Sequence, residues 1–108
     1  MIDIKIAVSS TGKDLNSDVD NVFGRCSYFV IAEIKNKKIV KVEAVKNTSA
    51  GKSGGAGISA AQFIADKGVN AVVAGSIGPR ALDVLNQFKI KTYEDKGSVK
   101  QVLQKFLR

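Results

Sequence analysis

The segment Phe23-Gly24-Arg25-Cys26 holds the two side chains of the chain best suited to binding a metal-containing anion. The planar cation of Arg25 suits oxyanions and sulfide-rich anions. Cys26 is the sole cysteine, and its thiol is either a soft metal ligand, a thiolate that Arg25 favours, or simply a small buried apolar group. One thiol cannot complete a zinc or iron–sulfur site by itself. The metal ligand that this segment still allows is therefore a preassembled cluster, held by one sulfur, Arg25 and backbone amides.

Two glycine-containing segments precede the first two predicted helices. Ser53-Gly54-Gly55-Ala56-Gly57 precedes one, and Gly75-Ser76-Ile77-Gly78-Pro79-Arg80 precedes the other. Free N–H groups and the helix dipole favour an anion at a helix start, and Ser76, Gly78 and Arg80 offer further donors. The structural alternative is that the glycines serve turn geometry and Ser53 caps its helix. Neither segment has the phosphate-loop pattern or the dinucleotide pattern.

The chain contains no histidine, which excludes Ser-His-Asp triads, Cys-His dyads and histidine-ligated metals. Its 17 Lys and Arg against 10 Asp and Glu give a net charge of +7, which favours anionic partners. The strongest excess lies in residues 35–52, where six lysines oppose one glutamate. Asp14, Asp18 and Asp20 lack the downstream glutamate of a calcium loop, so we interpret them as a solvated loop.

Hydrophobic periodicity predicts an α/β chain with the element order β-β-β-α-β-α-β-α. The predicted strands are 2–8, 27–34, 38–45, 69–74 and 90–93, with a hairpin turn at 35–37. The predicted helices run from Ile58 to a terminating Gly68, from Pro79 to Phe88, and over 99–107 with Ser98 as cap. Residues 9–26 and 46–57 are the long polar loops, and a loop of such length is functional or poorly ordered.

Parallel crossovers and the hairpin together predict a five-stranded mixed sheet with the order 3-2-1-4-5, in which only strand two is reversed. This order places the loops 9–26, 46–57 and 75–79 along one edge of the sheet. Ligands of open α/β sheets bind at that edge, near the switch point between strands one and four.

The length of 108 residues and the apolar fraction of 44% predict one globular domain spanning residues 1–108. No apolar run is long enough to cross a bilayer, and the start lacks the pattern of a signal peptide. One cysteine forms no internal disulfide, which fits a cytoplasmic location.

The motifs FGRC, GGAG and Gly-x-x-Gly-Pro, in this order within residues 4–94, resemble those of the dinitrogenase iron–molybdenum cofactor biosynthesis family. The resemblance implies a ribonuclease-H-like three-layer fold. It also implies binding of an iron–molybdenum cofactor, its precursor, or a molybdenum–copper–sulfur cluster held largely by non-covalent contacts. The family motifs point to Phe23, Gly24, Arg25, Cys26, Gly54, Gly55, Gly57, Gly78 and Pro79, and the loop argument adds Ser53, Ser76 and Arg80.

The sequence therefore predicts a non-catalytic carrier of an anionic metallocluster that is isolated with or without its cluster. Cofactor-assembly or scaffold proteins are its expected partners, and no membrane is expected. The alternative is a nucleic-acid or small-anion binding module. Nucleic acid is disfavoured because nuclease chemistry on such a fold needs clustered carboxylates, and only Asp3 and Glu33 lie on the first two strands. An enzyme using Cys26 as nucleophile lacks an evident base.

Overall fold

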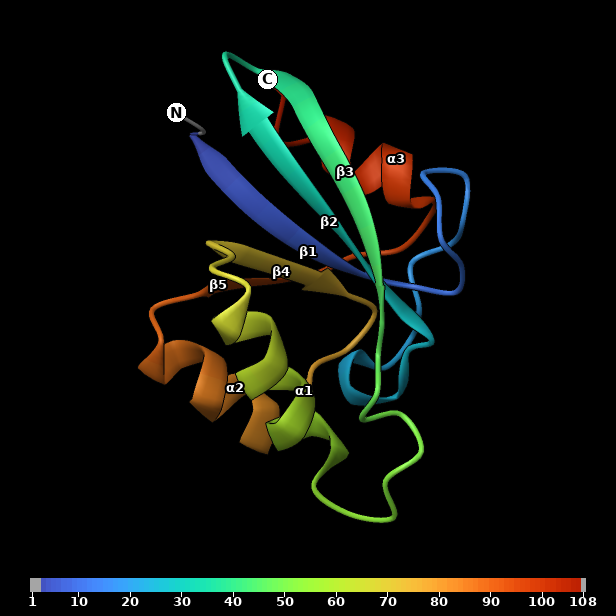
Figure 1. Cartoon of the computed structure of the whole chain (residues 1–108), viewed down its shortest axis with the longest axis vertical. Helices are drawn as coiled ribbons and strands as arrows, with labels where there is room; N and C mark the ends of the chain where they lie inside the picture. The colour runs from blue at the N-terminus through green and yellow to red at the C-terminus, as the bar shows by residue number, and fades with distance from the viewer. Residues whose placement is uncertain (1–2, 108) are drawn as a thin grey trace.

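Five strands form a single mixed sheet in the computed structural model, which describes residues 3–107 (Figure 1). The strands are β1 (Ile4–Ser10), β2 (Tyr28–Lys35), β3 (Lys38–Lys46), β4 (Ala71–Ala74) and β5 (Lys91–Glu94), in the order β3-β2-β1-β4-β5. β2 runs antiparallel to both of its neighbours, whereas β1, β4 and β5 are parallel. The predicted order and strand directions are confirmed. Ile2 and Arg108, at the ends of the predicted domain, lie outside the described residues.

The helices make a layer on each side of the sheet, so that the fold has three layers (Figure 1). The helices α1 (Ala56–Asp66) and α2 (Pro79–Gln87) cover one face, and α3 (Val99–Gln104) covers the other. Side-chain alternation along β1 explains the division. Ile6 and Val8 belong to the buried cluster under α3, whereas Ala7 between them belongs to the cluster under α1 and α2.

Several local predictions are confirmed at the ends of elements. Asn36 takes a left-handed φ of 52° in the hairpin turn, and Gly68 takes a φ of 74° after α1. Pro79 occupies the first turn of α2. Ser98 caps α3, where its hydroxyl oxygen accepts from the amide of Gln101 at 3.1 Å.

Several predicted boundaries are wrong by a few residues. β1 runs to Ser10 rather than to Val8, so the polar loop after it begins two residues later than predicted. The helix α1 begins at Ala56 rather than at Ile58, and its N-cap is Gly55 with a φ of 70°, so Ser53 is not the cap. β4 begins only at Ala71, because Asn70 hydrogen-bonds to Lys5 through both its side chain and its backbone. The last helix ends at Gln104, three residues earlier than predicted.

The long polar segment after β1 is held by backbone hydrogen bonds. The amide of Thr11 donates to Asp18 O at 3.0 Å, and that of Asp20 donates to Ser9 O at 2.8 Å. The amide of Gly75, at the end of β4, donates to Asp20 O at 2.9 Å. This segment therefore follows the carboxyl ends of β1 and β4, and it delivers the short 3-10 helix η1 (Phe23–Arg25) to that edge of the sheet. Within residues 3–107, no helix is long and apolar enough to cross a membrane.

Candidate anion site at the carboxyl edge of the sheet

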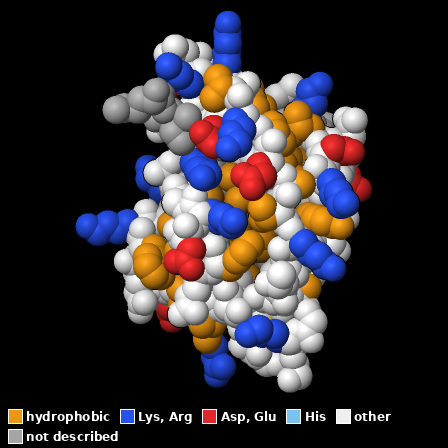
Figure 2. Space-filling view, in the orientation of Figure 1, with side chains coloured by type: hydrophobic (Ala, Val, Ile, Leu, Met, Phe, Trp, Pro, Cys, Tyr) orange, Lys and Arg blue, Asp and Glu red, His pale blue; other side chains and the backbone are white. Residues whose placement is uncertain are grey.

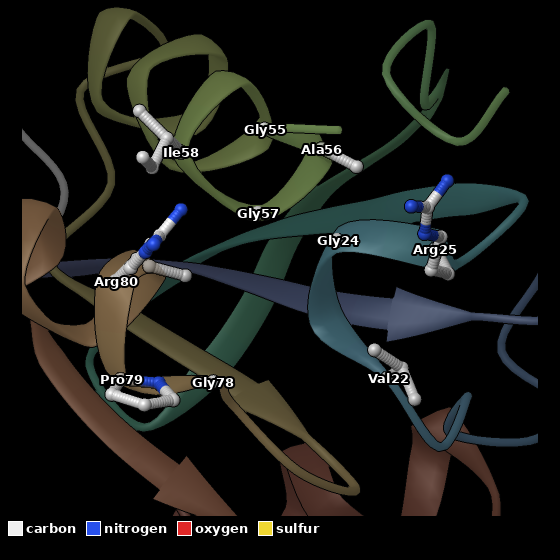
Figure 3. Close-up of a pocket in the computed structure, with 11 residues that line it drawn as sticks. Val22, Gly24, Arg25, Gly55, Ala56, Gly57, Ile58, Gly78, Pro79 and Arg80 are labelled. Carbon is white, nitrogen blue, oxygen red and sulfur yellow. The ribbon is translucent and has the colours of Figure 1, made fainter. Parts of the chain in front are cut away.

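A cavity of about 360 Å³ lies where η1 meets the first turns of α1 and α2 (Figure 3). Three segments that are far apart in the sequence contribute its walls. Those walls are formed by Val22, Gly24, Arg25, Gly55, Ala56, Gly57, Ile58, Gly78, Pro79, Arg80 and Ala81. The cavity thus includes part of the FGRC segment and part of both predicted helix starts. Two arginines line it, and no carboxylate does.

Glycine at two of these positions allows close packing, against backbone atoms at Gly24 and against a side chain at Gly57. A Cβ on Gly24 would lie 2.7 Å from Gly57 Cα and 2.8 Å from Gly57 N. A Cβ on Gly57 would lie 3.3 Å from Ala81 Cβ, so this glycine lets α1 approach α2. These glycines therefore bring η1, α1 and α2 together, and the shape of the cavity depends on them.

The helices α1 and α2 both begin at the cavity without a side-chain cap. Gly55 and Gly78 are their N-caps, and neither helix has a side-chain hydrogen bond to its first turn. The first intrahelical bonds are Ser59 N to Gly55 O at 3.0 Å and Leu82 N to Gly78 O at 2.9 Å. The amides of Ala56, Gly57, Ile58, Arg80 and Ala81 precede these bonds, and all five residues line the cavity. Two positive helix ends thus face one space.

The two arginines have different positions. Arg80 extends from the start of α2 toward the first turn of α1, whereas the guanidinium of Arg25 turns away from the glycines (Figure 3). Nη1 of Arg25 donates to Ala50 O at 3.0 Å and also to Lys52 O. Both side chains are exposed at the rim. Arg25 therefore ties the loop between β3 and α1 to η1, while Arg80 supplies positive charge between the two helix starts.

Cys26 lies in the protein core beneath η1. Its side chain is fully buried and does not line the cavity. Burial, together with a smaller contribution from the charge of Asp20, raises the pKa of the Cys26 thiol to about 11, against opposing effects of neighbouring hydrogen-bonding groups. The thiol donates to Phe23 O at 3.3 Å. The expectation that Arg25 favours a Cys26 thiolate is therefore wrong, since the group is a neutral thiol at neutral pH.

Four other predicted site residues lie outside the cavity wall. Phe23 is buried and packs on Phe29, with ring centroids 5.3 Å apart. The hydroxyl of Ser76 donates to Asn21 O at 2.9 Å, which attaches the loop after β4 to the segment before η1. Ser53 and Gly54 are exposed in the loop that precedes Gly55. The structure brings together Gly24, Arg25, Gly55, Gly57, Gly78, Pro79 and Arg80.

Sequence reasoning missed Asn47, a buried residue whose side chain hydrogen-bonds to the backbone of the η1 segment. This residue follows β3 and is 3% exposed. Its Nδ2 donates to Gly24 O at 3.2 Å and to Cys26 O at 2.9 Å, and its Oδ1 accepts from the amide of Ser49 at 3.1 Å. Within a polar loop, nothing in the sequence distinguishes this buried asparagine from an exposed one. The apolar wall residues Val22, Ala56, Ile58 and Ala81 were also missed, although three of them adjoin a predicted glycine or arginine.

Comparisons with known proteins agree with this architecture. A family model described as dinitrogenase iron-molybdenum cofactor matches residues 4–108. An uncharacterised protein of Methanocaldococcus jannaschii is 37% identical over 93 residues, which are 85% of this chain and 79% of the relative.

Two solved structures share the fold and a substantial part of the sequence. The orange protein from Desulfovibrio gigas, solved in its apo form, is 38% identical with a TM-score of 0.88, over 95% of this chain and 86% of the other. A Thermotoga protein described as a candidate NifB protein is 32% identical with a TM-score of 0.78, over 95% of this chain and 86% of the other. The chain therefore belongs to the dinitrogenase iron–molybdenum cofactor family.

Proposed function

We propose that this protein is a non-catalytic carrier of an anionic metal–sulfur cluster, bound in the cavity between η1, α1 and α2. The observation that carries the proposal is the meeting of two uncapped helix starts and two arginines around one cavity that no carboxylate lines. Each helix start has a partial positive charge of about one half, and anions are the ligands that such ends favour.

The size of the cavity supports a ligand larger than a single oxyanion. Since a water molecule occupies about 30 Å³ in the liquid, a cavity of about 360 Å³ has room for about a dozen heavy atoms. Its wall also includes the aliphatic side chains of Val22, Ile58 and Pro79 beside the polar groups. A polyatomic anion with soft, weakly hydrated sulfur atoms suits such a mixed lining. The family supports an iron–molybdenum cofactor, and the resemblance of the motifs extends the proposal to a related cluster of molybdenum, copper and sulfur.

The cluster is held by backbone amides and guanidinium groups, without a bond from the protein to a metal. Cys26, the only thiol in the chain, is buried and neutral beneath η1. No histidine is present in the sequence to replace it. Non-covalent binding suits a carrier, because the cluster can be transferred without breaking a coordination bond. Cofactor-assembly proteins in the cytoplasm are the partners that supply and accept it.

The lining of the cavity supports binding rather than catalysis. The residues at the cavity offer no carboxylate, histidine or thiol as a general base or nucleophile. The two strand carboxylates considered for nuclease chemistry are far away in the fold. Asp3 accepts from the amide of Asn36 at the hairpin end of the sheet, and Glu33 pairs in register with Lys5 near that same end.

The proposal is tested by anaerobic titration of the purified protein with tetrathiomolybdate and Cu(I), and separately with isolated iron–molybdenum cofactor. Molybdenum retained after desalting is measured together with the visible absorption. We expect stoichiometric retention of one of the two species. The variant Arg25→Ala/Arg80→Ala is expected to retain it at least tenfold more weakly, since each charged hydrogen bond contributes about 1.5–3 kcal/mol.

Two controls make the result specific to the cavity. Lys96→Ala/Lys100→Ala removes the same charge from exposed positions at and just before α3, and it should leave retention unchanged. Cys26→Ser should also retain the cluster, and its loss in a folded Cys26→Ser variant would contradict the non-covalent mode. Retention of neither cluster, with tight binding of molybdate or phosphate alone, would instead identify a small-anion module.

A further inference from the structure

The outer edge of β3 has no strand beside it. β3 spans nine residues, Lys38–Lys46, and pairs on its inner side with β2. No other strand in residues 3–107 pairs with it, so the backbone groups on its outer side face solvent. The opposite edge of the sheet, β5, has only four residues. A long free edge is a template for the addition of another strand through main-chain hydrogen bonds.

Two apolar side chains of β3 are exposed. Val40 is 55% exposed and Val42 is 40% exposed. Val40 sits where the register between β2 and β3 shifts, and Val42 lies opposite Ala32 of β2. Single exposed valines are common on protein surfaces. Two of them within three residues of one free edge give an added strand apolar contacts in addition to its hydrogen bonds.

The same edge is strongly basic. Residues 35–46 contain five lysines and one glutamate, a net charge of 5 − 1 = +4. Nζ of Lys41 lies 3.8 Å from Oε2 of Glu33. Lys38 and Lys46 are exposed at the two ends of the strand. Figure 2 shows lysine and arginine side chains spread over this side of the molecule, with hydrophobic side chains visible between them.

We propose that the outer edge of β3 binds an acidic, extended segment of a partner protein, which adds to the sheet as a sixth strand beside β3. Main-chain hydrogen bonds provide the affinity, and the lysines select acidic side chains. The same lysines disfavour a second copy of this chain. Two β3 strands paired antiparallel about Val42 would place Lys38 opposite Lys46. Lys41 would lie opposite Glu43 in that register, but the two segments would each keep a net charge of +4 and repel one another.

Nucleic acid fits this edge less well than an acidic strand does. Residues 35–46 contain no arginine and no aromatic side chain. Proteins that bind single strands rely on aromatic stacking as well as on positive charge. An exposed strand edge with valines offers hydrogen bonds and apolar contacts that a polypeptide can use, and those contacts are of no use to a phosphate backbone.

The proposal is independent of the cluster that the protein carries. It nevertheless places the partner beside the cavity, because β3 ends at Lys46 and the next residue, Asn47, holds the carbonyls of Gly24 and Cys26. A protein that exchanges cargo with this one would thus dock next to the cavity wall. Loss of cluster binding in the Arg25 and Arg80 variants would leave the docking edge intact, so failures of the two proposals can be distinguished.

The test uses the full-length ¹⁵N-labelled protein and the probe peptide Glu-Val-Glu-Val-Glu-Val-Glu. We expect alternate amides of β3 to exchange with solvent at least tenfold more slowly in the presence of the peptide. A peptide with lysine at every glutamate position should not bind. A peptide with proline at the central valine should bind at least tenfold more weakly, because proline removes a hydrogen-bond donor and interrupts the strand.

Charge reversal on the protein provides the matched variants. Lys38→Glu/Lys46→Glu should weaken peptide binding about tenfold, since exposed charge pairs contribute up to about 1 kcal/mol each. Lys96→Glu/Lys100→Glu changes the net charge equally away from β3 and should have little effect, and circular dichroism checks that both variants fold.

Three results would overturn the proposal. They are equal binding of the proline peptide, protection of β3 by a second copy of the chain at high protein concentration, and protection of β3 by a single-stranded oligonucleotide in place of the peptide.

Discussion

The free backbone amides at the start of α3 are capped by a side chain, whereas those at the starts of α1 and α2 are not. In α3, Ser98 accepts from the amide of Gln101, and the Gln101 side chain accepts from the amide of Ser98 at 2.9 Å. This reciprocal cap satisfies the end of a short helix from within the protein. The starts of α1 and α2 have glycine at the N-cap and no side-chain bond to the first turn.

The difference in capping corresponds to what each helix start faces in the fold. The start of α3 packs on the segment after β1, where the amide of Val99 donates to Ser17 O at 2.8 Å. The starts of α1 and α2 instead face the cavity. Backbone donors are thus satisfied by a side chain at the start of α3, whereas the starts of α1 and α2, which meet at the cavity, have no side-chain cap. Four experiments on the cavity and the helix starts test this difference.

Gly24→Ala should destabilise the protein by about 2–3 kcal/mol, because the new methyl group overlaps the backbone of Gly57 and the neighbour cannot move as a side chain would. Urea denaturation measures the free energy of unfolding. Gly54→Ala is the matched control, since a Cβ there meets no atom within 4 Å, and it should change stability by about 0.5 kcal/mol or less. Equal stabilities of the two variants would mean that the contact between η1 and α1 is not tight.

The buried thiol beneath the cavity wall should make the protein less stable at high pH. The pKa of Cys26 is raised from 9.0 to about 11 in the folded state, so the unfolded chain releases its proton first. The stabilisation is complete below pH 9 and is lost as the pH rises toward 11, by about 3 kcal/mol at most. Denaturation at several pH values measures this loss. Lysine titration also contributes there, so the quantity to compare is the difference in slope between the natural protein and Cys26→Ala. Identical slopes would contradict a buried neutral thiol.

Gly78→Asp gives α2 the kind of cap that α3 already has. The N-cap backbone is extended, with φ −66° and ψ 159°, and an added Cβ there meets no atom within 4 Å. We expect a gain in stability of a few tenths of a kcal/mol. We also expect at least tenfold weaker retention of the cluster, because the carboxylate occupies the donors and repels the anion. Gly78→Ala separates the two effects, since it adds bulk without charge and should retain more cluster than the aspartate variant.

Ser98→Ala removes the cap of α3 and should cost about 1 kcal/mol of stability. Cluster retention, measured by molybdenum content after desalting, should stay unchanged because α3 lies on the other face of the sheet. A loss of cluster in a folded Ser98→Ala protein would show that the two kinds of helix start are not independent.

The strand order was predictable because alternation, the hairpin and right-handed crossovers leave few arrangements. The starts of α1 and α2 were predictable to within two residues, since Pro79 and the glycines have local conformational preferences. The roles of the individual site residues were less predictable. Whether Gly24 approaches a ligand or the backbone of Gly57 depends on a contact between residues 33 positions apart. The burial of Cys26 and the hydrogen bonds of Asn47 likewise depend on tertiary packing, which local sequence does not determine.

The close approach of Gly24 to Gly57 has an evolutionary consequence. Because an added methyl group at Gly24 would meet main-chain atoms, no side-chain change elsewhere can make room for it. Arg80, in contrast, is exposed at the rim, so its replacement requires no repacking of the core. The frame of the cavity and its charge are therefore inherited separately. Substitutions at the rim can change the charge of the cavity, while the glycines preserve its shape.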